Sequence, residues 1–344
     1  MAADTKQLSI IIPVHNVKEY LAACLDSVLS QSFQDFEVVI VDDVSTDGSK
    51  DIAYAYAAKH PEQVRVLEHT VNTRQGGARN TGIDAALGKY ILFLDSDDYL
   101  KPDAFDVLLR TAEETNADIV EFCQEWVDEN GVFLRRQSWP ERALHPESAE
   151  QSITISGMGP CNKLCRKELF SDGNIRFPEK YFYEDYWTVP KLLLRANKVV
   201  YLNRSFYCYR QRISSTTHDT NPERNRDVLL GTDELLKYFR ENNISSQRMA
   251  ELEYLAIEHV LVNATLRVNG IDRKNPLQNE ILQYINDRFP NWQKNIYLSY
   301  LPAKKQQLLK LIVQKKYGLL YLRYHCRNNL TGTAKRILHK LKGN

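Results

Sequence analysis

The chain has 344 residues, of which 43% are hydrophobic, and its formal net charge is +1 at pH 7. This length is enough for one large domain with an appendage, or for two domains. The N-terminus lacks a signal-peptide pattern, and no apolar run approaches the roughly 20 residues that span a bilayer, so we expect a cytoplasmic protein. The scattered cysteines, without a Cys-x-x-Cys pair, argue against a disulfide framework or a zinc site.

In the first half, short apolar runs alternate with amphipathic stretches, which is typical of βαβ units and a mainly parallel sheet. The predicted strands are residues 8–14, 36–41, 64–68 and 90–94. The predicted helices are 17–30, 48–59, 76–87 and 102–114. A hairpin is predicted between residues 118–127 and 132–137, because Asn130-Gly131 can supply the positive φ angles of a tight turn. Beyond about residue 225 the pattern becomes helical, at 229–238, 249–268 and 277–289, which predicts domains 1–225 and 226–344.

Polar residues follow each of the four predicted strands, where ligands bind to an open α/β sheet. In chain order they are Pro13-Val14-His15-Asn16, Asp42-Asp43, Asn72 to Asn80, and Asp95-Ser96-Asp97-Asp98. The last group puts three carboxylates within four residues, and their mutual repulsion calls for a positive partner. Mg²⁺ or Mn²⁺ carrying a diphosphate is the first candidate, because hard cations take oxygen ligands. A solvated Asp-rich turn is the alternative.

The segment from Asn72 to Asn80 suits an anionic ligand. Gly76 and Gly77 permit close approach of the backbone, and the helix that follows offers N–H groups. Arg79 adds a fork-shaped donor for phosphate. Neither the phosphate-binding loop Gly-x-x-x-x-Gly-Lys nor the dinucleotide motif Gly-x-Gly-x-x-Gly is present, and a plain helix-entry loop is the alternative.

Five segments together resemble the bacterial family 2 glycosyltransferases with the GT-A fold. They are Ser-Ile-Ile-Ile-Pro-Val-His-Asn at 9–16, Leu-Ser-Gln-Ser-Phe at 29–33, Val-Asp-Asp-Val-Ser-Thr-Asp-Gly-Ser at 41–49, Gly-Gly-Ala-Arg-Asn-Thr-Gly at 76–82, and Phe-Leu-Asp-Ser-Asp-Asp at 93–98. The resemblance covers about residues 7–220. It implies an α/β GT-A domain, followed here by a helical C-terminal region, and an inverting, metal-dependent transfer from a nucleotide sugar, for which we expect a UDP-sugar.

The resemblance implies roles in donor binding for residues that match the family's motifs by position. Asp43 resembles the acid that holds the uracil ring. The same nucleotide-sugar pocket is expected to include Pro13, Val14, His15, Asn16, Asn72, Gly76, Arg79, Asp95 and Ser96. Asp97 matches the direct metal ligand of the family's Asp-x-Asp element. Asp95 is expected nearer the ribose and is a second candidate metal ligand. His15 stands where the family often has Tyr.

The resemblance also implies a catalytic base in a Glu-Asp pair, and Glu184-Asp185 stands in the matching place. We choose Asp185 as the base, because a carboxylate at a helix start among aromatic residues such as Trp187 can take a proton from an acceptor hydroxyl. Helix capping is the alternative, since acids favour the first turn, and the two roles can coexist.

Two further segments resemble family elements near the acceptor and the diphosphate. They contribute Lys163 from Asn-Lys-Leu, and Arg210, Arg212 and Ser214 from a Tyr-x-Arg…Ser stretch. Cationic side chains there are expected to neutralise the leaving diphosphate. His218 is a candidate extra metal ligand, with an ordinary surface histidine as the alternative.

Basic residues are concentrated at the C-terminal end. Residues 288–344 contain thirteen Lys and Arg but no Asp or Glu, which leaves residues 1–287 with a net charge of −12. Because Leu, Ile and Tyr are interspersed with these cations, the segment is typical of one that lies on an anionic membrane surface, here the inner face of the cell membrane. The alternatives are a solvated basic face, an oligomer contact through C-terminal helices, and nucleic-acid binding, which we do not expect.

The predicted acceptor is a hydroxyl of a glycan or lipid-linked saccharide, as in bacterial surface polysaccharide synthesis. A nucleotidyltransferase that makes nucleotide sugars is one alternative, but it would have a glycine-rich loop with Arg and Lys near the N-terminus. A catalytically silent nucleotide-sugar-binding module is the other, and the intact Asp97 and Asp185 argue against it. A two-carboxylate hydrolase explains none of the nucleotide motifs.

Overall fold

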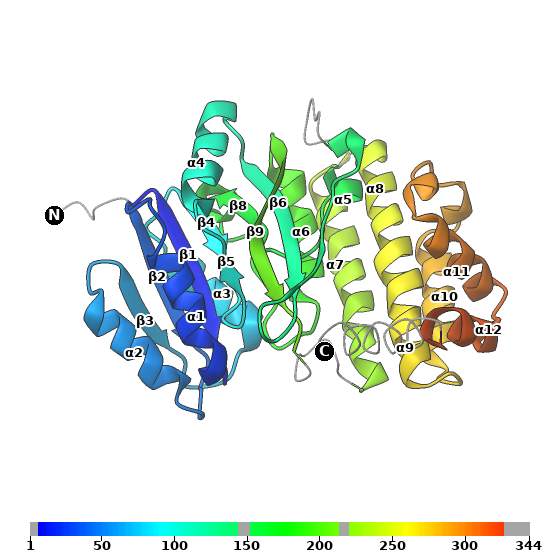
Figure 1. Cartoon of the computed structure of the whole chain (residues 1–344). Coiled ribbons are helices and arrows are strands. Elements are labelled where there is room, and N and C mark those ends of the chain that lie inside the picture. Colours follow the sequence, from blue (N-terminus) through cyan, green and yellow to red (C-terminus); the bar gives the residue numbers. More distant parts are fainter. Residues whose placement is uncertain (1–5, 144–151, 213–219, 327–344) are drawn as a thin grey trace, which may run out of the picture. The chain divides into compact units, whose positions relative to one another are not determined.

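The structure is a computed structural model that describes residues 6–143, 152–212 and 220–326. The chain divides into two compact units, Met1–His218 and Asp219–Asn344. In Figure 1 the first unit runs from blue to green and the second from yellow-green to red. No helix in the described part of the chain is long and apolar enough to cross a membrane.

A nine-stranded sheet forms the centre of the first unit (Figure 1). Four strands pair in parallel in the order β3-β2-β1-β4. They are β1 (Leu8–Val14), β2 (Phe36–Asp42), β3 (Val64–Glu68) and β4 (Tyr90–Phe93). Every residue of β1, β2 and β4 is buried, as expected for parallel strands covered on both faces. The ranges predicted for these strands are correct to within one residue.

Beyond β4 the sheet is mixed, and its order continues β8-β6-β9-β5. The strands are β5 (Tyr99–Leu100), β6 (Ile119–Val127), β7 (Phe133–Arg136), β8 (Lys163–Arg166) and β9 (Val199–Arg210). β8 is antiparallel to both neighbours, whereas β9 is parallel to β6. The predicted hairpin is present as β6 and β7, although in its turn Gly131 has a positive φ (82°) and Asn130 does not.

Helices cover both faces of this sheet. They are α1 (Lys18–Leu29), α2 (Ser49–Lys59), α3 (Arg74–Ala85), α4 (Ala104–Thr115), α5 (Ser152–Ile155) and α6 (Glu184–Arg195). Ala78 of α3 packs on Val39 of β2. Phe105 of α4 meets Phe36, three residues before Val39, edge-on at 5.2 Å. Because successive strand residues point to opposite faces, α3 and α4 lie on opposite sides of the sheet. The helices α1, α2 and α3 each begin at the carboxyl edge of the sheet, shortly after the strand that precedes them.

The second unit is helical. Its helices are α7 (Arg226–Glu241), α8 (Ser246–Ala256), α9 (Thr265–Ile271), α10 (Leu277–Arg288), α11 (Ala303–Val313) and α12 (Tyr317–Tyr321). A π-helical stretch, Ile257–Ala264, joins α8 to α9, so the helix predicted at 249–268 is part of one continuous run with a wider turn in its middle. The buried side chains of this unit include Leu252, Val260 and Ile281.

Candidate functional site

Residues that follow β1, β2 and β3 meet at the carboxyl edge of the sheet. His15 Nδ1 lies 2.7 Å from the backbone oxygen of Asp43, and Asn72 Nδ2 donates to the same oxygen at 3.3 Å. Asn16 Oδ1 accepts from the backbone N–H of Thr46, in the loop after β2, at 2.8 Å. The predicted pocket residues His15, Asn16, Asp43 and Asn72 are therefore brought together. Pro13 and Val14 belong to the buried strand β1, and the Val14 side chain is fully buried.

Asp43 is held in place through one oxygen only. Its Oδ1 accepts from the Thr73 backbone N–H at 2.9 Å and lies 2.8 Å from His69 Nδ1. Its Oδ2 is buried and has no hydrogen-bond partner among the described residues. A buried carboxylate oxygen without a partner is costly, so Oδ2 is available to accept from an N–H group of a ligand. His69 was not predicted as a site residue, although it directly follows β3, where ligand-binding residues of such a sheet are expected.

Backbone strain is concentrated in the loops around this edge. Val44, directly after Asp43, has φ 64°, which is rare for a β-branched residue. Tyr183, directly before Glu184, has φ 61°. Left-handed conformations of this kind cluster at ligand-binding and catalytic sites, where the surrounding structure enforces them.

The acids after β4 have separate donors. Asp98 is buried and accepts from the Tyr207 hydroxyl at 2.5 Å and from the Arg210 backbone N–H at 2.7 Å. Asp97 Oδ2 lies 2.5 Å from Arg212 Nη2. Burial, and then the charge of a neighbouring carboxylate, raise the pKa of Asp97 and raise that of Asp98 well above its usual range. These hydrogen bonds of Asp98 tie the end of β9 at Arg210, and with it Arg212 two residues on, to the acidic turn Asp95–Asp98.

Arg79 joins the acidic turn to the start of α6. Its Nη2 donates to Asp95 Oδ1 at 2.8 Å and its Nη1 donates to Glu184 Oε1 at 2.6 Å. The Arg79 side chain is only 2% exposed, and its guanidinium lies over the ring of Phe177. Both terminal nitrogens of Arg79 thus bind carboxylates of the protein itself. The contact of Arg79 with a nucleotide stays a prediction.

Asp185 lies beside Glu184 in the first turn of α6. Burial, followed by the charge of Glu184, raises the pKa of Asp185 to about 7. Its Oδ1 accepts from the Tyr186 backbone N–H at 2.7 Å. A carboxyl group that titrates near neutrality is suited to accept a proton from a substrate hydroxyl, because general bases work best when their pKa is near the operating pH.

The aromatic residues around Asp185 differ in exposure. Tyr181 is 41% exposed and stacks on Trp187, with ring centroids 4.9 Å apart and planes tilted by 31°. Trp187 and Tyr186 are buried. Phe182 lies under the guanidinium of Arg74 at 4.2 Å. Tyr181, backed by Trp187, is the ring of this group best placed to meet an acceptor sugar.

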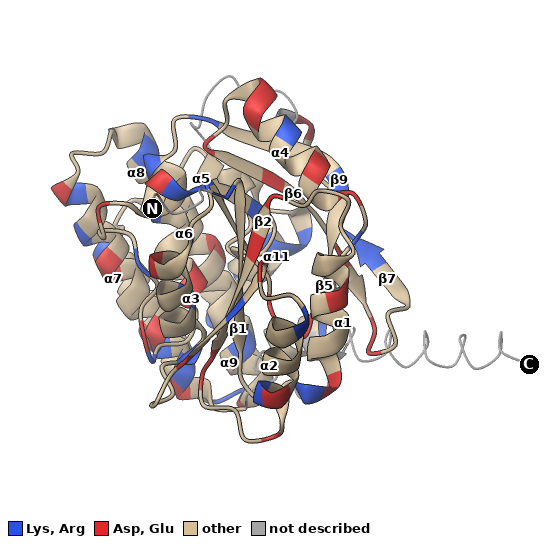
Figure 2. Cartoon of the chain, turned by 90° about the vertical axis from the view of Figure 1, so that its left-hand side faces the viewer, with Lys and Arg blue, Asp and Glu red and all other residues tan. Residues whose placement is uncertain are grey.

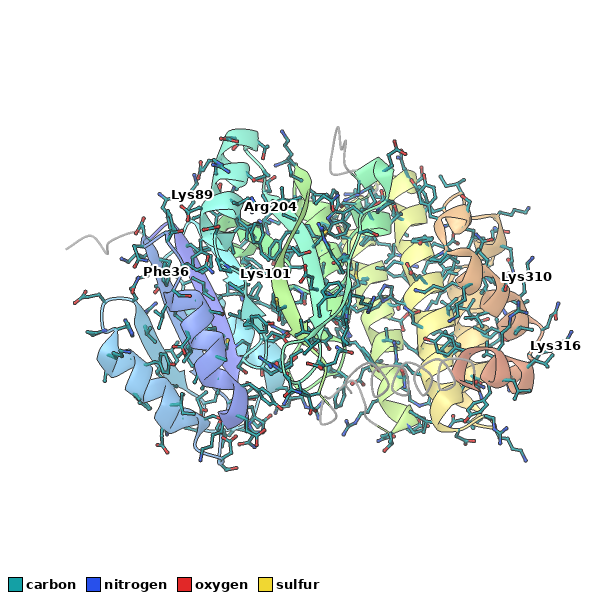
Figure 3. All side chains as sticks on the ribbon, in the orientation of Figure 1. Phe36, Lys89, Lys101, Arg204, Lys310 and Lys316 are labelled. Carbon is teal, nitrogen blue, oxygen red and sulfur yellow. The ribbon has the colours of Figure 1, made fainter. Side chains whose placement is uncertain are left out.

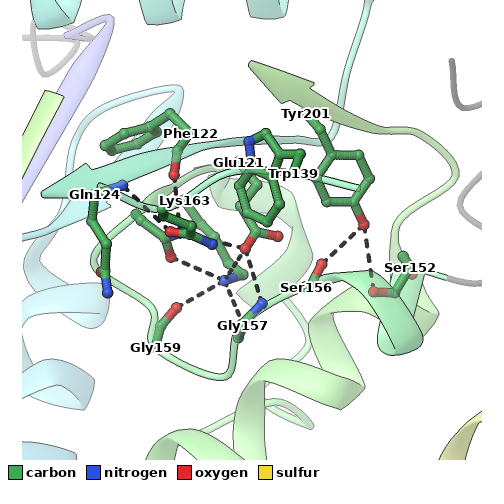
Figure 4. A network of polar contacts seen from close by, with 12 residues as sticks. Glu121, Phe122, Gln124, Trp139, Ser152, Ser156, Gly157, Gly159, Lys163 and Tyr201 are labelled. Atoms are coloured by element: carbon green, nitrogen blue, oxygen red, sulfur yellow. Dashed lines mark hydrogen bonds and ion pairs between the residues drawn. The ribbon is translucent and has the colours of Figure 1, made fainter. Parts of the chain in front are cut away.

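The predicted role of Lys163 in binding an acceptor or diphosphate is not supported. Its ammonium group is enclosed by Glu121 Oε1 (3.0 Å), the backbone oxygens of Gly157 (2.7 Å) and Gly159 (2.8 Å), and Asn162 Oδ1 (3.1 Å), as Figure 4 shows. Both members of the Lys163–Glu121 ion pair are fully buried. An ammonium group has three donors, so none is left for a ligand, and Lys163 instead fixes the loop that precedes β8.

Gly76 also has a different role from the predicted one. A Cβ at this position would lie 2.2 Å from the backbone oxygen of Pro178. The missing side chain therefore allows the chain around Pro178 to pack on α3, and it does not leave room for a ligand. Ser96, another residue predicted to line the nucleotide-sugar pocket, is buried, with 5% of its surface exposed.

The two arginines at the end of β9 share an aromatic support. Both guanidinium groups lie over the ring of Tyr20, at 5.3 Å for Arg210 and 5.0 Å for Arg212. Arg210 also donates to the backbone oxygens of Asp97 (3.0 Å) and Glu129 (2.6 Å). The predicted residues Ser214 and His218 lie outside the described residues.

Within the described ranges no three His, Cys, Asp or Glu side chains converge as a metal site. The residues present nevertheless fit a hard cation that arrives with a diphosphate, because such cations are commonly held by one or two carboxylates and complete their shell with phosphate and water. Asp97 and Asp95 can supply those carboxylates once Arg212 leaves Asp97.

Comparison with known proteins identifies the family. The model of Glycosyl transferase family 2 matches residues 9–173. The chain is 32% identical over 220 residues to the glycosyltransferase GlyG of Streptococcus pneumoniae, an alignment that covers 60% of this chain and 72% of GlyG. The chain belongs to glycosyltransferase family 2.

A second relative is the poly(ribitol-phosphate) β-N-acetylglucosaminyltransferase TarS of Staphylococcus aureus. It is 32% identical over 208 residues, which cover 59% of this chain and 35% of TarS. The crystal structure of TarS residues 1–349 in complex with UDP-GlcNAc matches with a TM-score of 0.63 and 22% identity, over 94% of this chain and 92% of that one. The match confirms the predicted GT-A fold with a helical C-terminal region.

A more distant structure of this fold contains a metal ion. The mannosyltransferase PcManGT from Pyrobaculum calidifontis, in complex with GDP-Man and Mn²⁺, matches with a TM-score of 0.53 and 14% identity, over 94% of this chain and 88% of that one. At this identity the match concerns the fold alone.

Proposed function

We propose that this glycosyltransferase is inverting and metal-dependent, and that it moves a hexosyl or N-acetylhexosaminyl group from a UDP-sugar to a hydroxyl of a glycan or lipid-linked saccharide in bacterial surface polysaccharide synthesis. The observation that carries the proposal is the Arg79 bridge, because it joins Asp95 of the acidic turn to Glu184, the neighbour of Asp185. Donor-binding acids and a base are thus parts of one site.

Asp43 favours uracil as the base of the donor. Its Oδ1 is already used by Thr73 and His69, so only Oδ2 remains to accept from a ligand. Uracil presents one ring N–H group, whereas guanine presents two neighbouring N–H donors that call for both oxygens of a carboxylate. A single free oxygen therefore matches a UDP-sugar better than a GDP-sugar.

Asp185 acts as the base. It accepts the proton of the acceptor hydroxyl as that oxygen attacks the anomeric carbon from the face opposite the diphosphate, so an α-linked donor gives a β-linked product. Glu184 helps to keep the pKa of Asp185 close to 7, and Arg79 fixes the position of Glu184. Tyr181 offers an apolar ring face on which the acceptor sugar can stack.

Asp97 and Asp95 would hold the divalent cation, Mn²⁺ or Mg²⁺, which when bound offsets the negative charge that develops on the leaving diphosphate. Arg212 leaves Asp97 when the donor binds and becomes available to the diphosphate, while Arg210 stays attached to the backbone of Asp97. These charges stabilise the transition state, and each factor of ten in rate needs about 1.4 kcal/mol of such stabilisation.

The test measures UDP release from a panel of UDP-sugars, with GDP-mannose as the control donor, in the presence of Mn²⁺ or of a chelator and with a mixed glycan and lipid acceptor extract. We expect metal-dependent release from one UDP-sugar and none from GDP-mannose. Release that survives the chelator would contradict the metal dependence, and release from GDP-mannose alone would contradict the choice of uracil.

A further inference from the structure

Basic and apolar side chains are exposed together at the end of the second unit. The stripe consists of Lys316, Leu319, Leu322 and Arg323, and it runs from the residue before α12 into the π-helical segment Leu322–Cys326. Leu319 is 53% exposed and Leu322 is 56% exposed. Residues three or four apart on a helix face the same side, so these side chains form one continuous surface strip.

Further residues of the same character flank the stripe at the end of α11. Lys310 and Lys315 are exposed, and Val313 is 42% exposed. The side chains of Lys310 and Lys316 point away from the ribbon into solvent (Figure 3). Among the described residues, no ion pair involves Lys310, Lys315 or Lys316. Because residues 288–344 contain no acid, these cations have no neighbour in the sequence to neutralise them.

This arrangement is unusual for a helix that faces only water. Such a helix normally buries its apolar residues and exposes polar ones, and Leu320 does face the core. Leu319 and Leu322 remain outside, between cations. On α4 and α7, by contrast, acidic and basic residues are mixed, as the red and blue segments in Figure 2 show. The stripe therefore combines exposed apolar side chains with cations, which are the two features of a segment that rests on an anionic bilayer.

We propose that the stripe docks the enzyme on an anionic phospholipid surface. Leu319 and Leu322 enter the boundary between headgroups and acyl chains, and Lys316 and Arg323, together with the flanking Lys315, contact the lipid phosphates. Nucleic acid is a poorer match, because phosphate contacts would use the cations and leave both leucines in water. The inference goes beyond the proposed function, since it depends on neither the donor nor the acceptor.

The test is co-sedimentation of the full chain with vesicles of phosphatidylcholine alone, and with vesicles that also contain phosphatidylglycerol. The charge variant is Lys315→Gln/Lys316→Gln/Arg323→Gln, and the apolar variant is Leu319→Ser/Leu322→Ser. The matched control, Lys59→Gln/Lys237→Gln/Lys274→Gln, removes the same charge from exposed positions outside the stripe. Thermal melting of each variant checks that it is folded.

We expect binding to the anionic vesicles only. At about a fivefold loss for each cation removed, the charge variant loses on the order of a hundredfold in vesicle affinity, and the control loses little. The apolar variant also binds more weakly. Equal binding by the charge variant and the control would overturn the proposal. So would equal binding to both kinds of vesicle, or binding to duplex DNA without binding to phosphatidylglycerol.

Discussion

Arg212 Nη2 lies 2.5 Å from Asp97 Oδ2, so a cationic side chain holds the carboxylate that we propose as a metal ligand. The two side chains are only 16% and 18% exposed, and Tyr20 supports the guanidinium from one side. Arg212 therefore occupies part of the place that a divalent cation needs. If Asp97 is a ligand of the cation, Arg212 would have to leave this carboxylate in the donor complex, and its guanidinium would then be available to the phosphates.

The Arg212→Gln variant should bind Mn²⁺ more tightly than the wild type in the absence of nucleotide. Even an exposed ion pair contributes up to about 1 kcal/mol, so removing this less exposed competitor should raise the affinity about fivefold or more. Turnover should fall, because the variant lacks a cation for the leaving diphosphate. Calorimetric titration with Mn²⁺ measures the first effect. Arg204→Gln on the exposed part of β9 is the control, and equal Mn²⁺ affinity in both variants would contradict the competition.

The pH dependence of transfer should report the base. The pKa of Asp185 is about 7, and the base must be deprotonated, so kcat/KM should fall about tenfold per pH unit below that value and level off above it. The charge of Glu184 raises this pKa, so Glu184→Gln should move the acid limb to lower pH. Glu234→Gln, on exposed surface of α7, should leave it unchanged. A limb that stays at the same pH in Glu184→Gln would disprove this coupling.

Arg79→Met should be strongly destabilising, because it leaves Asp95 and Glu184 without their common partner. Removing one partner of a buried charge network typically costs about 3–5 kcal/mol in the free energy of unfolding. Arg288→Met is the comparison, since the side chains of Arg288 and its partner Asp233 are 44% and 40% exposed and their ion pair should contribute about 1 kcal/mol or less. Urea denaturation measures both. Similar losses in the two variants would mean that the bridge is not structurally important.

Lys163→Met should reduce stability without changing donor affinity. The variant leaves Glu121 charged and buried, at a cost of about 3–5 kcal/mol, and adding Glu121→Gln should recover part of that loss. UDP affinity, measured by calorimetry at a temperature where the variants are folded, should match the wild type. A loss of UDP affinity in a folded Lys163→Met variant would restore the diphosphate role suggested by its sequence motif.

The first four strands could be predicted, because β1, β2 and β4 consist mostly of apolar residues and are separated by longer, more polar stretches that form the helices. β9 could not, since Asn203, Arg204 and Ser205 interrupt its apolar pattern where its register with β6 shifts. The site residues at the strand ends could be predicted because ligands of an open α/β sheet bind at the carboxyl ends of its strands. The same rule applies to His69, which follows β3 and could have been predicted as well.

Partners of buried charges could not be predicted from the sequence. Arg79 and Glu184 are 105 residues apart, and no periodicity relates them. Lys163 stands in a motif typical of a site but is buried against Glu121, and a sequence pattern does not distinguish an ammonium group that faces a ligand from one enclosed by backbone oxygens.

The central claim is that Asp97 and Asp185 serve one site in different roles. The direct test measures UDP affinity in the presence of Mn²⁺ and single-turnover transfer in parallel, for the wild type, Asp97→Asn and Asp185→Asn. We predict that Asp97→Asn loses the Mn²⁺-dependent part of UDP affinity. We also predict that Asp185→Asn binds UDP like the wild type but transfers sugar about 10²–10⁴-fold more slowly. Transfer at the wild-type rate by Asp185→Asn, or unchanged Mn²⁺-dependent affinity in Asp97→Asn, would contradict the account.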